Sequence, residues 1–290
     1  MKPIAIPVRA IGPGSQPTSD DELALLSMPR EMPGFEMPAL PHAVDARHRH
    51  GAADVLLHLI DALRGYRIGE GAGPRVDLAP LPAATREALD QALGEGEVSA
   101  VVAVPERVEI QETVFAGVWR VRHLDAQGRV LRDLLEACDI PEAVALGAAA
   151  GWRATPAAAT FGEGIMNAPM LLKEIAAQSA SYRPGAPAHV VNLTLLPMSP
   201  ADQVCLSEVL ADGGATLLSR GFGKCRITST TLANTWWVRY FNSVDTLILN
   251  TVEVVDVPEV AKAAQDDLDD TRERLLELAD WLRADWPAES

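Results

Sequence analysis

The chain matches itself when it is shifted by 117 positions. Residues 81–144 then pair with residues 198–261 without a gap, and 14 of the 64 pairs are identical. The matches include Trp119 with Trp236, and an Asp-x-Pro-Glu sequence recurs near the end of both stretches. Two copies are too few for a solenoid, so the pattern predicts a pseudo-symmetric pair of similar units.

Residues 217–258 are the most β-favouring part of the chain. Short alternating runs of β-branched and aromatic residues are separated there by turn residues such as Gly221 and Gly223. We expect three or four antiparallel strands, with Trp236 and Trp237 on opposite faces of one that lies inside the sheet. Because the repeat places a similar meander and helices in the first copy, the predicted fold class is α+β.

The composition divides the chain into five segments. They are a Pro/Met-rich extended arm (1–52), a first copy of helices plus meander (53–145), a Gly/Ala-rich connector (146–167), a second copy (168–262) and the remainder of a long C-terminal helix (263–290). The first copy is predicted to open with a core-facing helix over residues 53–66. The C-terminal helix is predicted to run from Pro258 to about residue 285, since proline suits a first helical turn and acidic residues follow.

Charge and hydropathy narrow the classes of partner. A net charge of −15 opposes nucleic acids and anionic membrane surfaces and favours a basic partner segment. No apolar run is long enough for a membrane span, and the start MKPIAIPVRA lacks the pattern of a signal peptide. We therefore expect a cytoplasmic protein.

The three cysteines and the histidines near residue 50 do not predict a metal or redox centre. Cys138, Cys205 and Cys225 are far apart and form no CxxC motif, so we expect buried thiols rather than disulfides or a metal site. His48 and His58, with His50 and Asp54, are typical of a solvated helix start. We expect no cofactor, no metal and no catalytic residues.

The two copies differ most at one hairpin. Residues 220–226 read RGFGKCR where residues 103–109 read AVPERVE, and Trp237 stands where the first copy has Arg120. Arginine and tryptophan are the residue types that most often anchor interfaces. The candidate partner-binding residues are Arg220, Gly221, Phe222, Gly223, Lys224, Arg226, Trp237, Arg239 and Asn242.

Several long motifs resemble a known family. The runs SRGFGKCRITST, NTWWVRYFNS and DTLILNTVEVVDVPEVA are similar to the C-terminal region of the HupH/HyaF/HoxQ family of nickel-iron hydrogenase expression/formation proteins. The likeness is close over residues 167–267 and thin before them. It implies a cytoplasmic, chaperone-like maturation accessory that binds the precursor of the iron-sulfur small subunit before export or assembly. Other accessory proteins of the same operon, such as a thioredoxin-like one, are implied as further partners.

Two other functions stay open at this point. Cys225 would serve as the thiol of an iron-sulfur or redox scaffold or enzyme, although no base or second thiol is placed beside it by the spacing. Alternatively, the chain would be a structural scaffold in a multi-protein maturation complex. The end of the C-terminal helix, near Trp281 and Trp286, is a possible homodimer contact.

Overall fold

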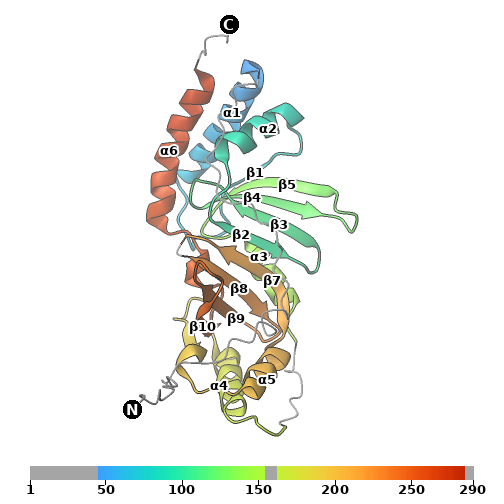
Figure 1. The fold of residues 1–290 in the computed structure, drawn as a ribbon. Coiled ribbons are helices and arrows are strands. Elements are labelled where there is room, and N and C mark those ends of the chain that lie inside the picture. The colour runs from blue at the N-terminus through green and yellow to red at the C-terminus, as the bar shows by residue number, and fades with distance from the viewer. Residues whose placement is uncertain (1–44, 154–161, 222, 285–290) are drawn as a thin grey trace, which may run out of the picture. The chain divides into compact units, whose positions relative to one another are not determined.

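The structure is a computed structural model that describes residues 45–153, 162–221 and 223–284. Within these residues, one antiparallel sheet has the strand order β1-β5-β4-β3-β2-β7-β8-β9-β10-β6, with helices packed on it (Figure 1). The first five strands are β1 (Arg75–Asp77), β2 (Val98–Val102), β3 (Arg107–Glu112), β4 (Val118–Leu124) and β5 (Val130–Ala137). The others are β6 (His189–Asn192), β7 (Asp212–Ser219), β8 (Lys224–Thr230), β9 (Thr235–Phe241) and β10 (Leu247–Val254). The predicted α+β class is confirmed.

The helices also fall into two sets. They are α1 (Ala46–Leu63), α2 (Ala83–Leu93), α3 (Glu142–Ala150), α4 (Ala168–Ser181), α5 (Pro200–Leu210) and α6 (Gln265–Arg283), with short 3-10 helices at Leu193–Leu195 and Glu259–Ala261. Three pairs of elements begin and end 117 positions apart: α2 with α5, β4 with β9, and β5 with β10. The internal repeat remains a prediction, and these bounds are in keeping with it.

The two halves of the sheet meet at the pairing of β2 with β7. Val98 lies opposite Ser219 and Val102 opposite Ala215, with regular antiparallel register between them. Each central strand therefore hydrogen-bonds to a neighbour on both sides, and the two meanders form one continuous sheet.

One face of the sheet carries a core shared by both halves, and we call it the tryptophan face. Trp119 and Trp236 are each 1% exposed, which confirms Trp236 as a core residue. Their indole N–H groups donate to the carbonyls of Cys138 (3.0 Å) and Val255 (3.2 Å), positions that are also 117 apart. Helix α3 packs over β2 and β7 on this face.

The opposite face has two separate cores, one at each end of the sheet. Helices α1, α2 and α6 cover the first half around Leu135 of β5, and α4 and α5 cover the second half around Val252 of β10. Figure 1 shows these two helix sets beside the two ends of the sheet. Between them the strands present partly exposed side chains, such as Val101 (36% exposed) and Leu218.

The first and last helices begin at different places from those predicted. Helix α1 starts at Ala46, because the Asp45 carboxylate accepts a hydrogen bond from the Arg47 N–H (2.9 Å) and caps it. Residues 46–52 thus belong to the helix and not to the arm, whose residues 1–44 lie outside the described residues.

The predicted helix start at Pro258 is wrong. The chain forms one 3-10 turn, becomes extended at Lys262, and Ala263 donates its N–H to the carbonyl of Asp139 (3.0 Å) before α6 begins at Gln265. That bond ties the segment to the first half, so the helix restarts beyond it. The apolar stripe of α6 packs against α1, with Leu275 and Leu282 buried.

Asp202 holds the start of α4 against the start of α5. Its carboxylate accepts from the N–H groups of Met166, Asn167 and Ala168 at 2.8–2.9 Å, and from Ser199 at 3.0 Å in a capping box. Burial alone would raise the pKa of this carboxyl, but the backbone donors outweigh it and lower the pKa to about 2.

Substitution Asp202→Ala is expected to lower the free energy of unfolding by about 2–4 kcal/mol, because it removes a cap and leaves buried N–H groups unpaired. Since the folded-state pKa lies below the usual value of about 3.9, the stabilisation is full above that value and is lost as the pH falls towards 2. Urea unfolding of both proteins at several pH values measures the difference. Glu208→Ala, an exposed change on α5, is the control and should shift the free energy by less than about 0.5 kcal/mol.

Candidate functional site

The predicted surface residues of β8 and β9 gather on the face opposite the two buried tryptophans. Arg226 lies directly opposite Arg239, and side chains opposite one another in an antiparallel pair share a face. Lys224 and Trp237 stand two residues away on the same strands, so they point to the same side. We call this side the arginine face, defined by Arg120, Arg122, Arg226 and Arg239.

Arg226 and Arg239 form a like-charge pair. Both side chains are half-buried, and among the described residues neither forms an ion pair with a carboxylate. The Arg239 guanidinium carbon lies 5.0 Å from the centre of the Trp237 ring, and its buried Nε has no hydrogen-bond partner. Burial, together with the charge of Arg226, lowers the pKa of Arg239 to about 10.

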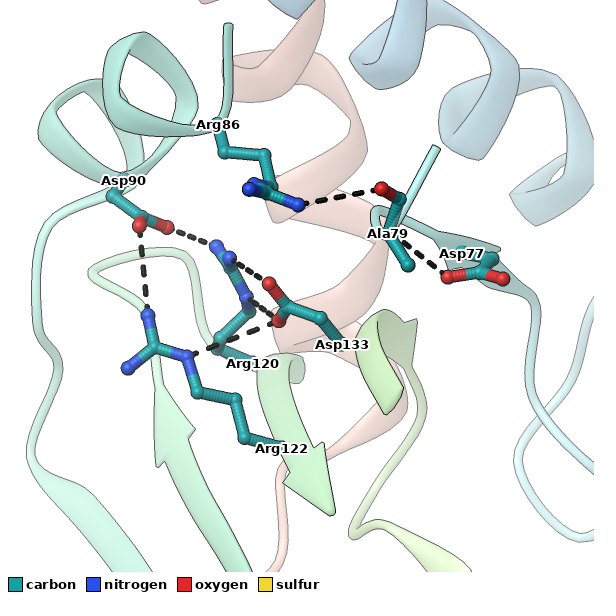
Figure 2. A network of polar contacts seen from close by, with 7 residues as sticks. All are labelled: Asp77, Ala79, Arg86, Asp90, Arg120, Arg122 and Asp133. Carbon is teal, nitrogen blue, oxygen red and sulfur yellow. Dashed lines mark hydrogen bonds and ion pairs between the residues drawn. The ribbon is translucent and has the colours of Figure 1, made fainter. Parts of the chain in front are cut away.

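The first half of the arginine face satisfies its charges internally. Arg120 donates to both oxygens of Asp133 (2.5 and 2.7 Å), and Asp90 of α2 contacts Arg120 and Arg122 (Figure 2). Arg122 also lies directly opposite Glu109. The charged residues of this network, Asp90, Arg120, Arg122 and Asp133, also line a surface hollow.

Trp237 occupies in the second half the place that Arg120 has in the first. Arg120 lies opposite Leu135 and Trp237 opposite Val252, and both pairs are 117 positions apart. The Trp237 indole N–H donates to Asn250 Oδ1 (2.5 Å), as Arg120 donates to Asp133. The ring is half-buried against the α4/α5 core. Trp237 therefore stabilises the fold and also forms part of the exposed surface.

The remaining predicted residues lie at the turns beyond this surface. Gly223 has φ +97°, which favours glycine, and forms a bridge with Gly221, while Phe222 lies outside the described residues. Lys224, which is on the arginine face at the start of β8, pairs with Asp245 of the following turn (2.6 Å). Arg220 donates its backbone N–H to the Glu97 carbonyl (3.1 Å).

Asn242 has a local structural role. Its side-chain oxygen accepts from the N–H groups of Val244 (3.0 Å) and Thr246 (2.9 Å), which shapes the turn between β9 and β10. The structure therefore brings Lys224, Arg226, Trp237 and Arg239 together on one face and leaves Asn242 in a turn.

Several exposed apolar residues of the second half were not among the predicted ones. Val204 of α5 and Leu247 and Ile248 of β10 are exposed, with Ile248 at 56%. The comparison of the two copies carries the signal for Val204, because Glu87 stands 117 positions before it. The first half thus has a charged side chain at this position, whereas the second half exposes an apolar one.

Cys225 points to the tryptophan face, away from the arginines. It is 2% exposed and lies opposite Tyr240, and burial raises the pKa of its thiol to about 11. Cys138 and Cys205 are also free and buried, which confirms the expectation of buried thiols. A thiol with a raised pKa carries little thiolate at neutral pH and is a weak nucleophile and metal ligand.

The histidines near residue 50 have ordinary contacts. His48 Nδ1 lies 2.9 Å from the Thr85 hydroxyl. Asp54, in the middle of α1, forms an ion pair with Arg283 of α6. In the part of the chain that the structure describes, no group of three or more His, Cys, Asp or Glu side chains is placed to hold a metal ion. None of the helices in that part is both long and apolar enough to cross a membrane.

The fold and this surface define an α+β protein with an aromatic and basic face on one half of its sheet. The family described as HupH hydrogenase expression protein, C-terminal conserved region, matches residues 51–150 and 165–282. The chain belongs to this family. Because residues 51–150 match as well, the similarity extends well before residue 167, contrary to the thin likeness expected there.

Relatives agree with this assignment over almost the whole chain. The hydrogenase expression/formation protein HoxQ of Cupriavidus necator is 45% identical over 285 residues, 97% of this chain and 99% of the relative. The protein HupQ of Azotobacter chroococcum is 45% identical over 93% of this chain and 95% of the relative. A solved structure, the hydrogenase expression protein HupH from Thiobacillus denitrificans, is 29% identical and covers 39% of this chain and 96% of that one; its TM-score of 0.37 is too low to support a comparison of folds.

Substitution Asp133→Asn is expected to lower the free energy of unfolding by about 3–5 kcal/mol, because it leaves the buried Arg120 guanidinium without its main counter-charge. Asp90→Asn is the matched control. Asp90 is 42% exposed, so its loss should cost about 1 kcal/mol or less. Urea unfolding compares the two, and equal losses would contradict the central place of Asp133 in the network.

The three thiols are expected to react slowly with Ellman's reagent in the folded protein at pH 8, because all three are buried. Unfolding in guanidinium should release all three within minutes. Rapid reaction of one equivalent in the folded protein that disappears in Cys225→Ser would contradict the burial of Cys225.

Proposed function

We propose that this protein is a chaperone-like accessory in the maturation of nickel-iron hydrogenase. It binds the precursor of the iron-sulfur small subunit before export or assembly, works in the cytoplasm, and has no catalytic role of its own. The names of the relatives, hydrogenase expression/formation proteins, support the pathway. Binding of the small subunit is the finer step of the proposal.

One observation supports binding at the arginine face of the second half. The matched positions of the first half hold a closed network of Arg120, Asp133 and Asp90, whereas the second half holds Trp237, Asn250 and Ser207. Arg239 lies over the Trp237 ring, and neither it nor Arg226 forms an ion pair with a described carboxylate. Aromatic and arginine side chains in a partly desolvated patch are the usual anchors of a protein interface.

The geometry favours binding over a redox role for Cys225. That thiol is buried, faces the other side of the sheet, and has a raised pKa. A scaffold role in a complex with other accessory proteins, such as a thioredoxin-like one, would use the same exposed surface. A homodimer through α6 has less support, because Trp281 packs against the core of the first half.

The proposal is tested by native mass spectrometry of the full chain mixed with the small-subunit precursor, with and without the precursor's N-terminal signal segment. A one-to-one complex is expected. Equal affinity for the two forms would show that the signal segment is not part of the bound surface. Absence of any complex with either form would contradict small-subunit binding.

A matched pair of variants locates the surface. Trp237→Arg alone should destabilise the fold by about 2–4 kcal/mol, because it places a guanidinium against the α4/α5 core without a carboxylate. Adding Asn250→Asp should recover much of that loss, since it recreates the pair seen at Arg120 and Asp133. The double variant is therefore expected to fold and to lose at least about tenfold in affinity, as an interface anchor does. A folded double variant with unchanged affinity would move the surface elsewhere.

A further inference from the structure

The arginine pair of the second half lacks the carboxylate that its counterpart has. In the first half Arg122 lies opposite Glu109, while 117 positions later Arg239 lies opposite Arg226. Like charges directly opposite on a sheet are unfavourable, and both side chains are partly withdrawn from water. The two arginines therefore repel one another in the free protein, and a bound anion would offset this repulsion.

The surroundings of the pair do not supply that anion. The chain carries 40 acidic residues against 25 basic ones, yet none of the described carboxylates is within ion-pair distance of Arg226 or Arg239. Asp212 of β7 acts on Arg239 only through space. The nearest cationic neighbour on the same strand, Lys224, is already paired with Asp245.

The shape of the patch favours a carboxylate on a polypeptide. Two guanidinium groups on adjacent strands present planar forks of donors, which match the two oxygens of a carboxylate. Leu218 lies directly opposite Arg226 on the other side, and Trp237 lies under Arg239, so apolar contacts flank the charged ones.

We propose that Arg226 and Arg239 form a carboxylate-binding subsite, which takes an Asp or Glu side chain of an acidic polypeptide segment lying across β7, β8 and β9. The subsite rests on the proposed function only for the identity of the partner. Net charge alone predicts a basic partner segment for this protein. The subsite would bind an acidic segment instead, because two arginines lie together on an otherwise acidic protein.

The test uses the arginine Nε–Hε signals of the full chain in proton-nitrogen correlation spectra. N-acetyl hexaglutamate amide is the probe, and the signals of Arg226 and Arg239 are assigned by their loss in single variants. Saturable shifts of these two signals are expected. No shift at millimolar peptide would overturn the subsite, and so would equal saturation by inorganic phosphate at the same concentration, since the site would then be a general anion site.

Substitution Arg226→Glu provides a readout of opposite sign. It places a carboxylate directly opposite Arg239, as Glu109 lies opposite Arg122, so the melting temperature should rise by about 1–3 °C while the peptide-induced shift of Arg239 is lost. Arg132→Glu, the same charge change at an exposed residue of β5, should leave the shift intact. Loss of the shift in both variants would show that only net charge matters and would overturn the subsite.

The chain's own acidic residues are the remaining occupant to exclude. The acidic residues outside the described part of the chain are changed together to amides in the full chain, without probe: Asp20, Asp21, Glu22, Glu31, Glu36, Asp285 and Glu289. Unchanged signals of Arg226 and Arg239 are expected, and a change in them would overturn binding of a separate polypeptide. Because no step uses the hydrogenase small subunit, failure of the subsite leaves small-subunit binding to be judged by mass spectrometry alone.

Discussion

The pairing of β2 with β7 is the constraint on which the rest of the structure depends. This ladder turns two meanders into one sheet, so that Trp119 and Trp236 share a single core on the tryptophan face. Helix α3 packs closely against β7 at this ladder. A Cβ on Gly214 would lie 2.0 Å from the Gly147 carbonyl oxygen of α3, so only glycine fits there. On the opposite face the helices cover the two ends of the sheet, and the strands between them remain partly exposed.

Much of the fold could be predicted because residues 81–144 can be compared with residues 198–261 of the same sequence. A shift of 117 positions aligns β4 with β9 and β5 with β10 from the sequence alone, and the alternation around Trp236 predicts its buried face correctly. The errors lay at helix starts, where local propensity competes with tertiary contacts. The proline at 258 signals a first turn, but the hydrogen bond from Ala263 to Asp139, a long-range contact that the sequence alone does not show, delays α6 to Gln265.

The candidate site could be predicted only in part, for a similar reason. Residue types singled out Arg226, Trp237 and Arg239, and the sheet does place them together. That two arginines lie face to face follows from strand register, which composition does not fix. Asn242 stands 117 positions after Asp125, and both side chains accept backbone N–H groups in equivalent turns, so its role is local and not one of surface recognition.

The ends of the sheet have a consequence for how this protein meets others. Its two edge strands, β1 and β6, are only three and four residues long, so they offer little free backbone to an incoming strand. A large open sheet with long bare edges would tend to join other sheets into fibres. Short edges direct encounters to side chains on the face instead, where recognition depends on charge and shape. The chaperone-like role proposed above would be served by such reversible contacts, because strand addition would be harder to undo.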